Sequence, residues 1–405
     1  MSSFLLSAVA VIVLAFWLGL ALDRRRRWPY ELVLPLPGSE WDGGAVAERV
    51  VALVPARDEA AVLPDTLPAL LRQEGLAGVV LVDDGSGDGT SEVARRLGAE
   101  AGGSRLEVVA APPRPAGWAG KVHAQATGFE VARRRFPDFE WLLLTDADIR
   151  HRPGSVAALV AQASRGFDLV SVMAKLRTET VWEKLLIPAF VYFFQLLYPF
   201  REVPRAGSRT AAAAGGCVLL RRSTLEQAGG FEVVRSRLID DVALAKAVAA
   251  AGGRPWLGLD PGIESVRPYS SLGELWRMVS RSAFVQLEYR WSLVLAVLVG
   301  LLLLFVSPPI GVALVLARAR AGGGFEPSSL PSPVAAGCFL LAWALQTREL
   351  LPAARHHRLA WPWALVVPAA SLLYAAMTLT SALAHGRAVA PTWRGRRYGR
   401  VDAEG

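Results

Sequence analysis

An apolar segment that ends in two carboxylates restricts the folds open to this chain. Trp141 to Thr145 is almost entirely large and apolar, and Asp146-Ala147-Asp148 follows it directly. Such a run is typical of a strand that is buried on both faces of a parallel sheet. Ligands of open α/β sheets bind beyond the carboxyl ends of the strands, where these two acids would lie. A capped turn would give the same pattern, so the neighbouring motifs have to decide.

Two earlier segments repeat this arrangement. Val50 to Pro55 and Gly78 to Val82 are apolar, and the acidic segments Ala56 to Glu59 and Asp83 to Thr90 follow them. Strands and helices that alternate at intervals of about 30 residues predict a doubly wound α/β sheet. The segment Asp83-Asp84-Gly85-Ser86 is compatible with a turn and a helix cap, or with a nucleoside site in which a carboxylate accepts hydrogen bonds.

Asp146 and Asp148 have the ligand chemistry of a divalent metal site. Carboxylate oxygens suit Mg²⁺ and Mn²⁺, which bind through one or two carboxylates together with substrate phosphates. A divalent metal cofactor, Mg²⁺ or Mn²⁺, held by Asp148 with the help of Asp146, is therefore one interpretation of this pair, beside the capped turn.

Three of these segments resemble a known family when they are taken in order. Pro55 to Glu59, Asp83 to Ser86 and Asp146 to Asp148 resemble the motifs of family 2 glycosyltransferases with the GT-A fold. One departure is Asp58, where the family more often has Asn. The resemblance implies a Rossmann-like nucleotide-diphospho-sugar transferase domain whose donor is a nucleotide-diphospho-sugar, with a UDP-sugar as first candidate. The residues that it assigns to donor binding are Pro55, Ala56, Asp58, Glu59, Asp83, Asp84, Lys121 and Asp146.

The segment Gly117-Trp118-Ala119-Gly120-Lys121 resembles family members that act on lipids, including ceramide and carotenoid glycosyltransferases. Its glycines permit close approach of backbone N–H groups to an anion, and Lys121 can neutralise a diphosphate. Taken whole, the chain resembles the bacterial hopanoid-biosynthesis-associated glycosyltransferases. This resemblance implies a membrane lipid acceptor, namely a hopanoid-type triterpenoid.

Asp240 and Asp241 form a second pair of acids. The segment Leu238 to Leu244 resembles the family's acidic-Asp-x-x-Leu motif, with Asp240 where Glu is more usual. By that match Asp241 is the catalytic base, with Asp240 beside it. Adjacent acids are also ordinary chemistry at a helix start. Because neighbouring side chains diverge on a helix, we expect only one of the two, Asp241, to face the crevice.

Two further segments are candidates for the acceptor region. In the resembled family the small-residue stretch that contains Gly215 and Gly216 lies between donor and acceptor. Arg290 and Trp291 are the other candidates, because processive relatives have Gln-x-x-Arg-Trp near this point. Gln286 is one residue too far from them, so Arg290 and Trp291 can equally form an interface anchor.

The N-terminal segment predicts a membrane anchor. Phe4 to Leu22 is uncharged and apolar, and a bilayer span takes about 20 residues. Arg24 to Arg27 follow this segment, whereas a secretory signal peptide has its positive charge first. The positive-inside rule then puts the next domain in the cytoplasm, and the resemblance to bacterial enzymes implies the bacterial inner membrane. The net charge is +8, but the sequence has no basic run interleaved with aromatic residues. The charge therefore indicates contact with a membrane and no nucleic-acid partner.

The C-terminal part predicts about three further spans, over 291–316, 333–345 and 362–383. Ser307-Pro308-Pro309 interrupts the first, which is either a kinked span or a re-entrant hairpin. For 181–200 we expect an interfacial helix, since a single crossing there would put Asp148 and Asp241 on opposite sides of the membrane. The arginine-rich tail favours the cytoplasm while three spans favour the outside, so its side stays open.

The predicted organisation follows from these segments. It comprises an anchor (1–27), a linker (28–47), a cytoplasmic GT-A catalytic domain (48–275), an amphipathic interface segment (276–291), a transmembrane region (292–385) and a basic tail (386–405).

The sequence therefore predicts an inverting, metal-dependent glycosyltransferase of the membrane. A processive polysaccharide synthase is the first alternative, although the expected spans are few for a secretion channel. A non-catalytic membrane scaffold is the second, although the metal and base acids are all present. A nucleotidyltransferase of similar fold is the third. The sugar, the exact lipid, the choice of metal and the oligomeric state are not determined by these patterns.

Overall fold

The computed structural model of the protein describes residues 3–26, 28–29, 31–34, 49–321, 332–386, 392–393 and 396–397. Most of the predicted linker and of the basic tail therefore lies outside the described residues. The chain divides into two compact units, which we name the sheet unit and the helical unit. The sheet unit comprises Pro29–Arg177, Tyr198–Pro268 and Thr392–Gly405, and the helical unit comprises Met1–Trp28, Thr178–Leu197 and Tyr269–Pro391.

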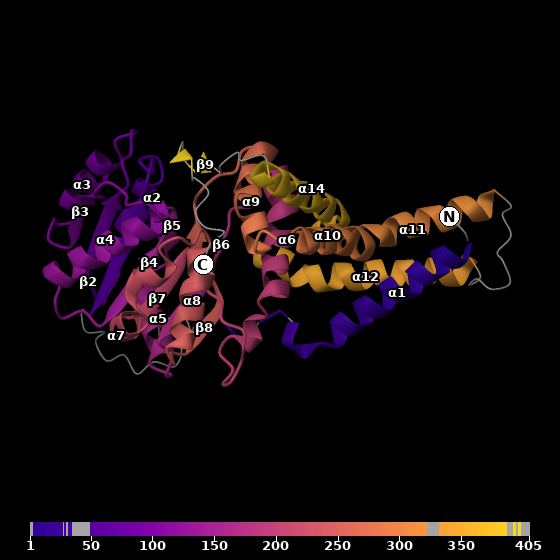
Figure 1. The fold of residues 1–405 in the computed structure, drawn as a ribbon, viewed down its shortest axis with the longest axis horizontal. Coiled ribbons are helices and arrows are strands. Elements are labelled where there is room, and N and C mark those ends of the chain that lie inside the picture. The colour runs from indigo at the N-terminus through magenta and orange to yellow at the C-terminus, as the bar shows by residue number, and fades with distance from the viewer. Residues whose placement is uncertain are drawn as a thin grey trace. The chain divides into compact units, whose positions relative to one another are not determined.

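The sheet unit is built on an eight-stranded sheet of order β3-β2-β1-β4-β7-β6-β8-β5 among the described residues (Figure 1). Its strands are β1 Val50–Ala56, β2 Leu76–Asp83, β3 Leu106–Ala110, β4 Trp141–Thr145, β5 Ile149–His151, β6 Leu169–Lys175, β7 Cys217–Arg221 and β8 Pro255–Ser265. Strands β3, β2, β1 and β4 run parallel, as expected. The sheet as a whole is mixed, because β7 runs antiparallel to both β4 and β6, and β5 antiparallel to β8.

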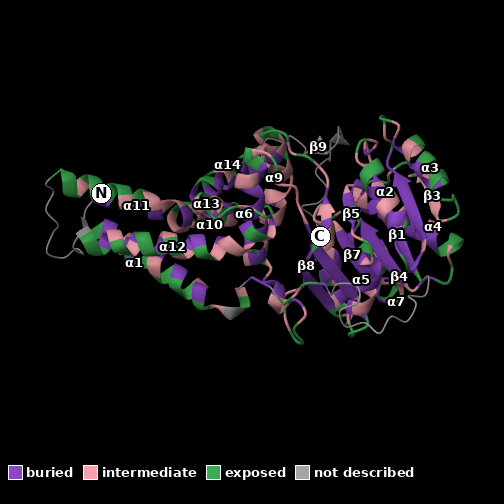
Figure 2. Ribbon diagram, turned by 180° about the vertical axis from the view of Figure 1, so that it is seen from behind, coloured by how far each residue is buried: buried purple, intermediate pink, exposed green. Residues whose placement is uncertain are grey.

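Helices cover this sheet on both faces. They are α2 Leu63–Leu71, α3 Thr90–Glu100, α4 Gly120–Arg135, α5 Ser155–Ala163, α7 Arg222–Gln227 and α8 Asp240–Ala250, with short 3-10 helices at Phe200–Glu202 and Gly230–Val234. Along β4, Trp141 and Leu143 join one apolar core, whereas Leu142 and Leu144 join the other. Figure 2 shows these strands as buried. The prediction of a strand buried on both faces is thus confirmed.

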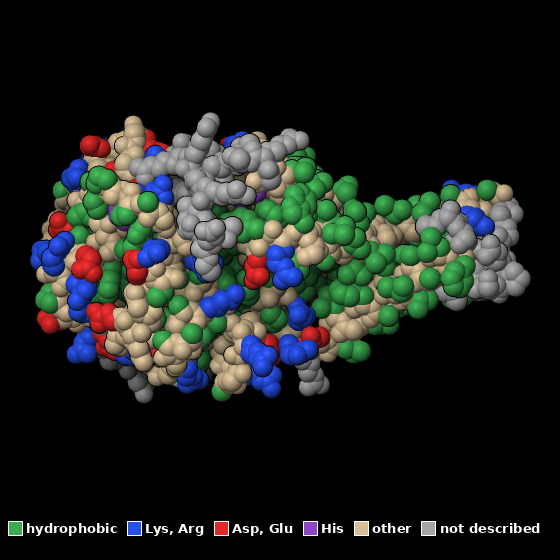
Figure 3. All heavy atoms as spheres, viewed as in Figure 1, with side chains coloured by type: hydrophobic (Ala, Val, Ile, Leu, Met, Phe, Trp, Pro, Cys, Tyr) green, Lys and Arg blue, Asp and Glu red, His purple; other side chains and the backbone are tan. Residues whose placement is uncertain are grey.

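The helical unit contains the apolar helices that the sequence predicts. Its described elements are α1 Ser3–Leu22, a 3-10 turn Arg24–Arg26, α6 Val181–Leu197, α9 Leu272–Gln286, α10 Trp291–Gly300, a π-helical turn Leu301–Val306, α11 Ser307–Arg320, α12 Ser332–His356, α13 Pro362–Leu365 and α14 Val367–Gly386. Five described helical segments are long and apolar enough to cross a membrane: Phe4–Leu22, Val181–Glu202, Trp291–Arg320, Pro333–His356 and Val367–His385. Figure 3 shows apolar side chains over the surface of this unit.

The first C-terminal span continues through its two prolines. The π-helical turn Leu301–Val306 joins α10 directly to α11, and Pro308 and Pro309 lie in the first turn of α11. Inside a continuous helix a proline nitrogen cannot donate to the preceding turn and its ring crowds that turn, and the widened π-helical turn accommodates the ring. The hydroxyl of Ser307 donates to the Leu303 carbonyl at 2.5 Å. The re-entrant hairpin is therefore wrong for this segment.

The second C-terminal helix runs further than predicted. Helix α12 ends at His356 and includes Arg348, Glu349 and Pro352, whereas the sequence suggested an end at Leu345. The prediction of an interfacial helix at 181–200 falls on α6, which packs against α12 and α14 inside the helical unit. The Tyr374 hydroxyl donates to the Leu186 carbonyl at 3.0 Å. The prediction that α6 lies at the membrane interface and does not cross the membrane stays a prediction.

Candidate active site

The sequence-predicted donor and base residues gather at one edge of the sheet. Pro55 and Ala56 close β1, Asp83 closes β2, and Asp146 follows β4. Because β7 is antiparallel to β4, its first residue pairs with Thr145, and the Asp146 N–H donates to the Gly216 carbonyl at 3.2 Å. The small-residue stretch before β7 therefore lies beside the carboxylates.

Lys121 connects the two acidic motifs. Its Nζ lies 2.7 Å from Oδ1 of Asp146 and 3.9 Å from Oδ2 of Asp240. Burial lowers the pKa of Lys121, but the carboxylates of Asp146, Asp240 and Asp241 outweigh burial and raise it. A cation in the first turn of α4 opposes the helix dipole. The surrounding carboxylates stabilise it there, and it stays charged.

Asp241 has the environment expected of a base. Its Oδ2 accepts a 2.7 Å hydrogen bond from the Gly215 N–H, and its Oδ1 accepts a 2.8 Å bond from its neighbour Val242. Burial and the charge of Asp240 raise the pKa of Asp241 to about 6, against the lowering effect of Lys121. A base with a pKa near the operating pH is efficient in proton transfer.

Asp240 also reaches the site, which corrects the expectation that only one of the two acids would. Both residues lie in the first turn of α8, and both carboxylates act on the Lys121 ammonium. Helical side chains lean toward the N-terminus, so neighbours in a first turn can approach one group that lies beyond the helix start. Leu244 is buried in the core, as predicted.

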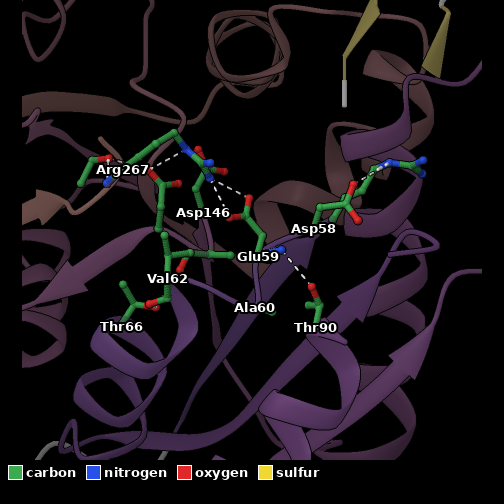
Figure 4. Close-up of polar contacts among 12 residues, drawn as sticks. Asp58, Glu59, Ala60, Val62, Thr66, Thr90, Asp146 and Arg267 are labelled. Carbon is green, nitrogen blue, oxygen red and sulfur yellow. Dashed lines mark hydrogen bonds and ion pairs between the residues drawn. The ribbon is translucent and has the colours of Figure 1, made fainter. Parts of the chain in front are cut away.

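Asp148 lies within a second cluster of charges. Its Oδ2 accepts a 2.5 Å hydrogen bond from the Ser265 hydroxyl and lies 3.4 Å from Nε of Arg267. The guanidinium of Arg267 also donates to both oxygens of Glu59, at 2.7 and 2.8 Å. Figure 4 shows Arg267 pointing at the Glu59 carboxylate, with Asp146 nearby. Glu59, which was predicted to contact the donor, is therefore paired with the guanidinium of Arg267, a residue far from it in the sequence.

The two loops after β1 and β2 fix one another. Asp58 has a φ of 53°, a left-handed conformation that Asn and Asp adopt more readily than other residues. This explains why Asp can replace the Asn of the resembled pattern. The Gly87 N–H donates to Oδ1 of Asp58 at 2.9 Å, and Asp83 accepts 2.6 and 2.5 Å bonds from the hydroxyls of Ser86 and Ser91. Asp83 and its loop are thereby held rigidly.

Asp84 is buried beside Asp83, and it belongs to the same pair of loops. The guanidinium of Arg57 donates to the Asp84 carbonyl at 2.5 Å and lies 3.8 Å from its carboxylate. A basic side chain from the first loop thus neutralises an acid of the second.

Among the described residues, no group of three or more His, Cys, Asp or Glu side chains is arranged to hold a metal. The pair Asp146 and Asp148 nevertheless fits an ion that takes its remaining ligands from a substrate, since Mg²⁺ binds through one or two carboxylates plus phosphates. Among the described residues, none donates a hydrogen bond to Oδ2 of Asp146 or to Oδ1 of Asp148. The contacts of Lys121, Ser265 and Arg267 are shortest to the other oxygen of each acid. The donor set therefore fits a divalent cation that arrives with a diphosphate.

The predicted acceptor residues divide between the two units. Gly215 and Gly216 belong to the sheet unit, and a Cβ on Gly215 would lie 3.0 Å from Oδ2 of Asp241 and 3.2 Å from Nζ of Lys121. Arg290 and Trp291 belong to the helical unit, where Trp291 begins α10 and Arg290 directly precedes it. Gln286 ends the preceding helix α9, so the glutamine and the Arg-Trp pair are on different helices.

Sequence reasoning missed three residues around the acids. Ser265 and Arg267 contact Asp148, and buried His151 lies 2.9 Å from Thr145 Oγ1 through its Nε2. Burial lowers the pKa of His151 to about 4, so its ring is neutral at pH 7. The Thr145 hydroxyl donates to the Gly216 carbonyl at 3.1 Å. No local pattern marked these three residues, since His151 stands between Arg150 and Arg152 in the sequence.

A comparison with known families decides the class. Residues 79–404, most of the chain, match the description Glycosyl transferase family 21. The chain belongs to this family. The expected glycosyltransferase class and Rossmann-like fold are thereby confirmed, and the family is numbered 21 where the motifs had suggested 2.

Curated relatives of this family 21 chain match it in part. An undecaprenyl-phosphate 4-deoxy-4-formamido-L-arabinose transferase from Pseudomonas aeruginosa is 29% identical over 188 residues, which are 44% of this chain and 49% of the relative. The enzyme of the same name from Aeromonas hydrophila is 30% identical over 143 residues, 33% of this chain and 40% of the relative. The chain thus spans about half the length of these relatives or less.

Solved structures of glycosyltransferases are similar as well. A mannosyltransferase from Pyrobaculum calidifontis in complex with GDP-Man and Mn²⁺ is 20% identical, with 92% of this chain and 99% of that chain covered and a TM-score of 0.48. Glucosyl-3-phosphoglycerate synthase from Mycobacterium tuberculosis in complex with Mn²⁺ and UDP-glucose is 17% identical, with 60% and 78% covered and a TM-score of 0.37.

Proposed function

We propose that this family 21 protein transfers one sugar from a nucleotide-diphospho-sugar to a membrane lipid, with inversion at the anomeric carbon. The observation that supports this proposal is the position of Lys121, whose ammonium contacts Asp146 and approaches Asp240. Lys121 therefore joins two pairs of acids in one charged centre. The acids after β4 suit the diphosphate end of a donor, and the acids that open α8 suit proton abstraction.

Charge neutralisation supports a divalent cation at the donor end. The carboxylates of Glu59, Asp146 and Asp148 face the cations of Lys121 and Arg267. A diphosphate that enters this site adds further negative charge. Asp148 and Asp146 would hold Mg²⁺ or Mn²⁺, which when bound stabilises the charge that develops on the leaving diphosphate. Lys121 would stabilise the same charge from the first turn of α4.

Asp241 is the base in this proposal. Its carboxylate takes the proton of the acceptor hydroxyl while the hydroxyl oxygen bonds to the anomeric carbon and the bond from that carbon to the diphosphate breaks. One displacement from the opposite face inverts the anomeric centre and needs no nucleophile from the protein. The Gly215 N–H orients Asp241 through its 2.7 Å hydrogen bond.

A neutral hydroxyl is the acceptor group that matches this chemistry. The carboxylates of Asp240 and Asp241 would repel an anion. A hydroxyl has to lose its proton, and Asp241, with a pKa of about 6, can accept that proton. The resemblance of the whole chain to hopanoid-associated enzymes makes a hopanoid-type triterpenoid the first candidate lipid. A lipid phosphate is the second candidate, because the curated relatives are named for undecaprenyl phosphate. A phosphate oxygen is already anionic and would need no base.

The membrane arrangement is part of the proposal. The five described helices long enough to span support a multi-pass protein of the bacterial inner membrane. The arginines after α1 support a cytoplasmic sheet unit, where nucleotide sugars would reach it.

The test combines lipid analysis with a reconstituted assay. A deletion strain should lack a lipid that carries one added hexose, as measured by mass spectrometry, and the purified protein should restore it from the sugar-free lipid and a UDP-sugar. A nucleoside diphosphate should be released. A polymeric product would instead support a processive synthase. Release of diphosphate would support a nucleotidyltransferase, and rescue of the deletion strain by the Asp241→Asn variant would support a scaffold. A product on lipid phosphate alone would select the second acceptor.

A further inference from the structure

Arg267 contacts two carboxylates of the donor site at once. Its Nη2 binds both oxygens of Glu59, and its Nε faces Oδ2 of Asp148 at 3.4 Å. The side chain of Glu59 is 7% exposed and that of Arg267 is 28% exposed. A nearly buried carboxylate needs a paired cation, so Glu59 anchors Arg267 in this position.

The closest contacts that Asp148 makes are with one of its oxygens. Ser265 donates a hydrogen bond to Oδ2, Nε of Arg267 lies nearest the same oxygen, and the backbone N–H of Arg267 donates to the Ser265 hydroxyl at 3.3 Å. Among the described residues, none donates a hydrogen bond to Oδ1. Asp148 is therefore held with one oxygen turned to the protein and the other available to a cation.

We propose that Arg267 is the internal counter-ion of Asp148 and sets how tightly this site binds a divalent cation. The inference rests on the proposed metal site. Because the guanidinium lies 3.4 Å from the Asp148 carboxylate, a cation held by Asp148 would be repelled by the positive charge of Arg267. Arg267 therefore weakens metal binding in the donor-free protein. A donor diphosphate adds negative charge that offsets the repulsion, so metal and donor bind together.

The test measures Mn²⁺ binding to the full-length protein by the EPR signal of free Mn²⁺, without and with UDP. Arg267→Gln should bind Mn²⁺ alone about three- to fivefold more tightly than wild type, the range expected for a partly exposed charge pair. The gain in Mn²⁺ affinity on adding UDP should be smaller by the same factor. Arg267→Lys, which keeps the charge, should resemble wild type.

Matched variants separate this effect from others. Arg150→Gln removes a positive charge two residues from Asp148, but its guanidinium pairs with Glu264, so Mn²⁺ affinity should not change. Asp148→Asn should abolish the tight binding and so identify the site. Because Arg267→Gln removes the cation that pairs with Glu59, the double variant Glu59→Gln/Arg267→Gln is measured beside it. It should also bind Mn²⁺ more tightly than wild type, which shows that the gain does not come from the Glu59 charge alone.

Each outcome gives a decision. Wild-type and Arg267→Gln proteins that bind Mn²⁺ equally would overturn the counter-ion and leave the metal site standing. An equal gain in Arg150→Gln would also overturn it, because the effect would then be general charge. If no protein in the set binds Mn²⁺ with or without UDP, the metal part of the proposed function fails and this inference fails with it.

Discussion

The backbone N–H of Gly215 donates a 2.7 Å hydrogen bond to Oδ2 of Asp241. The donor precedes β7 and the acceptor opens α8, so the bond joins two elements that pack in the same core beside the acids of β4. A Cβ at this position would lie 3.0 Å from the accepting oxygen, so a larger residue would push the Asp241 carboxylate aside by a few tenths of an ångström.

Gly215→Ala should lower the transfer rate by about tenfold or more, because small misplacements of catalytic groups can cost up to about 10²-fold. The added methyl displaces Asp241 and Lys121 while the rest of the sheet unit keeps its packing. Initial rates and circular dichroism measured on the same preparation check this. Gly337→Ala, where a Cβ meets nothing within 4 Å, is the control and should retain full activity.

Asp148→Asn should abolish transfer while the protein still folds. The amide keeps the shape and the hydrogen bond to Ser265 but lacks the charge that a divalent cation needs. A titration with Mg²⁺ or Mn²⁺ should show the defect in metal-dependent donor binding. Full activity of this variant in the presence of a chelator would end the metal hypothesis.

Asp241→Asn should lose transfer by about 10²- to 10⁴-fold, the usual cost of removing a general base, and should still bind donor and metal. Asp240→Asn should lose less, since it adjusts the charge around Lys121 and Asp241 without taking the proton. Transfer and nucleotide-sugar binding are assayed separately. If Asp240→Asn is inactive while Asp241→Asn keeps nearly normal turnover, the catalytic base is Asp240 and not Asp241.

The transfer rate should fall as the pH drops below about 6, because Asp241 has a pKa of about 6 and acts as a base only when deprotonated. The rate should fall tenfold per pH unit below that point, measured as kcat/KM for the acceptor. The negative charge of Asp240 contributes to raising this pKa. Asp240→Asn should therefore move the acidic limb to lower pH, and an unmoved limb would assign it to another group.

An engineered cysteine at Ser104, an exposed position of the sheet unit, should resist an impermeant thiol reagent in intact cells. The arginines after α1 favour the cytoplasmic side for the segment that follows. Labelling should appear once the membrane is permeabilised. The experiment uses a Cys338→Ser background, which removes the half-buried native thiol. Cys217 is left in place because it is buried. Labelling in intact cells would overturn the orientation and the cytoplasmic donor.

The sequence alone determined the local parts of this protein. Apolar runs followed by acids identified β1, β2 and β4 and the acids at their carboxyl ends, because burial and turn chemistry depend on neighbouring residues. The same local logic found the first helix, from its unbroken apolar run, and the acids that open α8. The end of α12 was predicted too early, because a helix continues through charged residues where these lie at exposed or half-buried positions, as Arg348 and Glu349 do.

Only the tertiary structure decided which distant charges meet. The antiparallel course of β7 brings Gly216 to Asp146, and no local pattern announces the direction of a strand. Arg267 meets Glu59 across a sequence separation of 208 residues, and both acids of α8 approach Lys121. An ion pair depends on the path of the whole chain and on the exclusion of water around it. The residues that adjust the charge of the site are therefore visible only once the chain is folded.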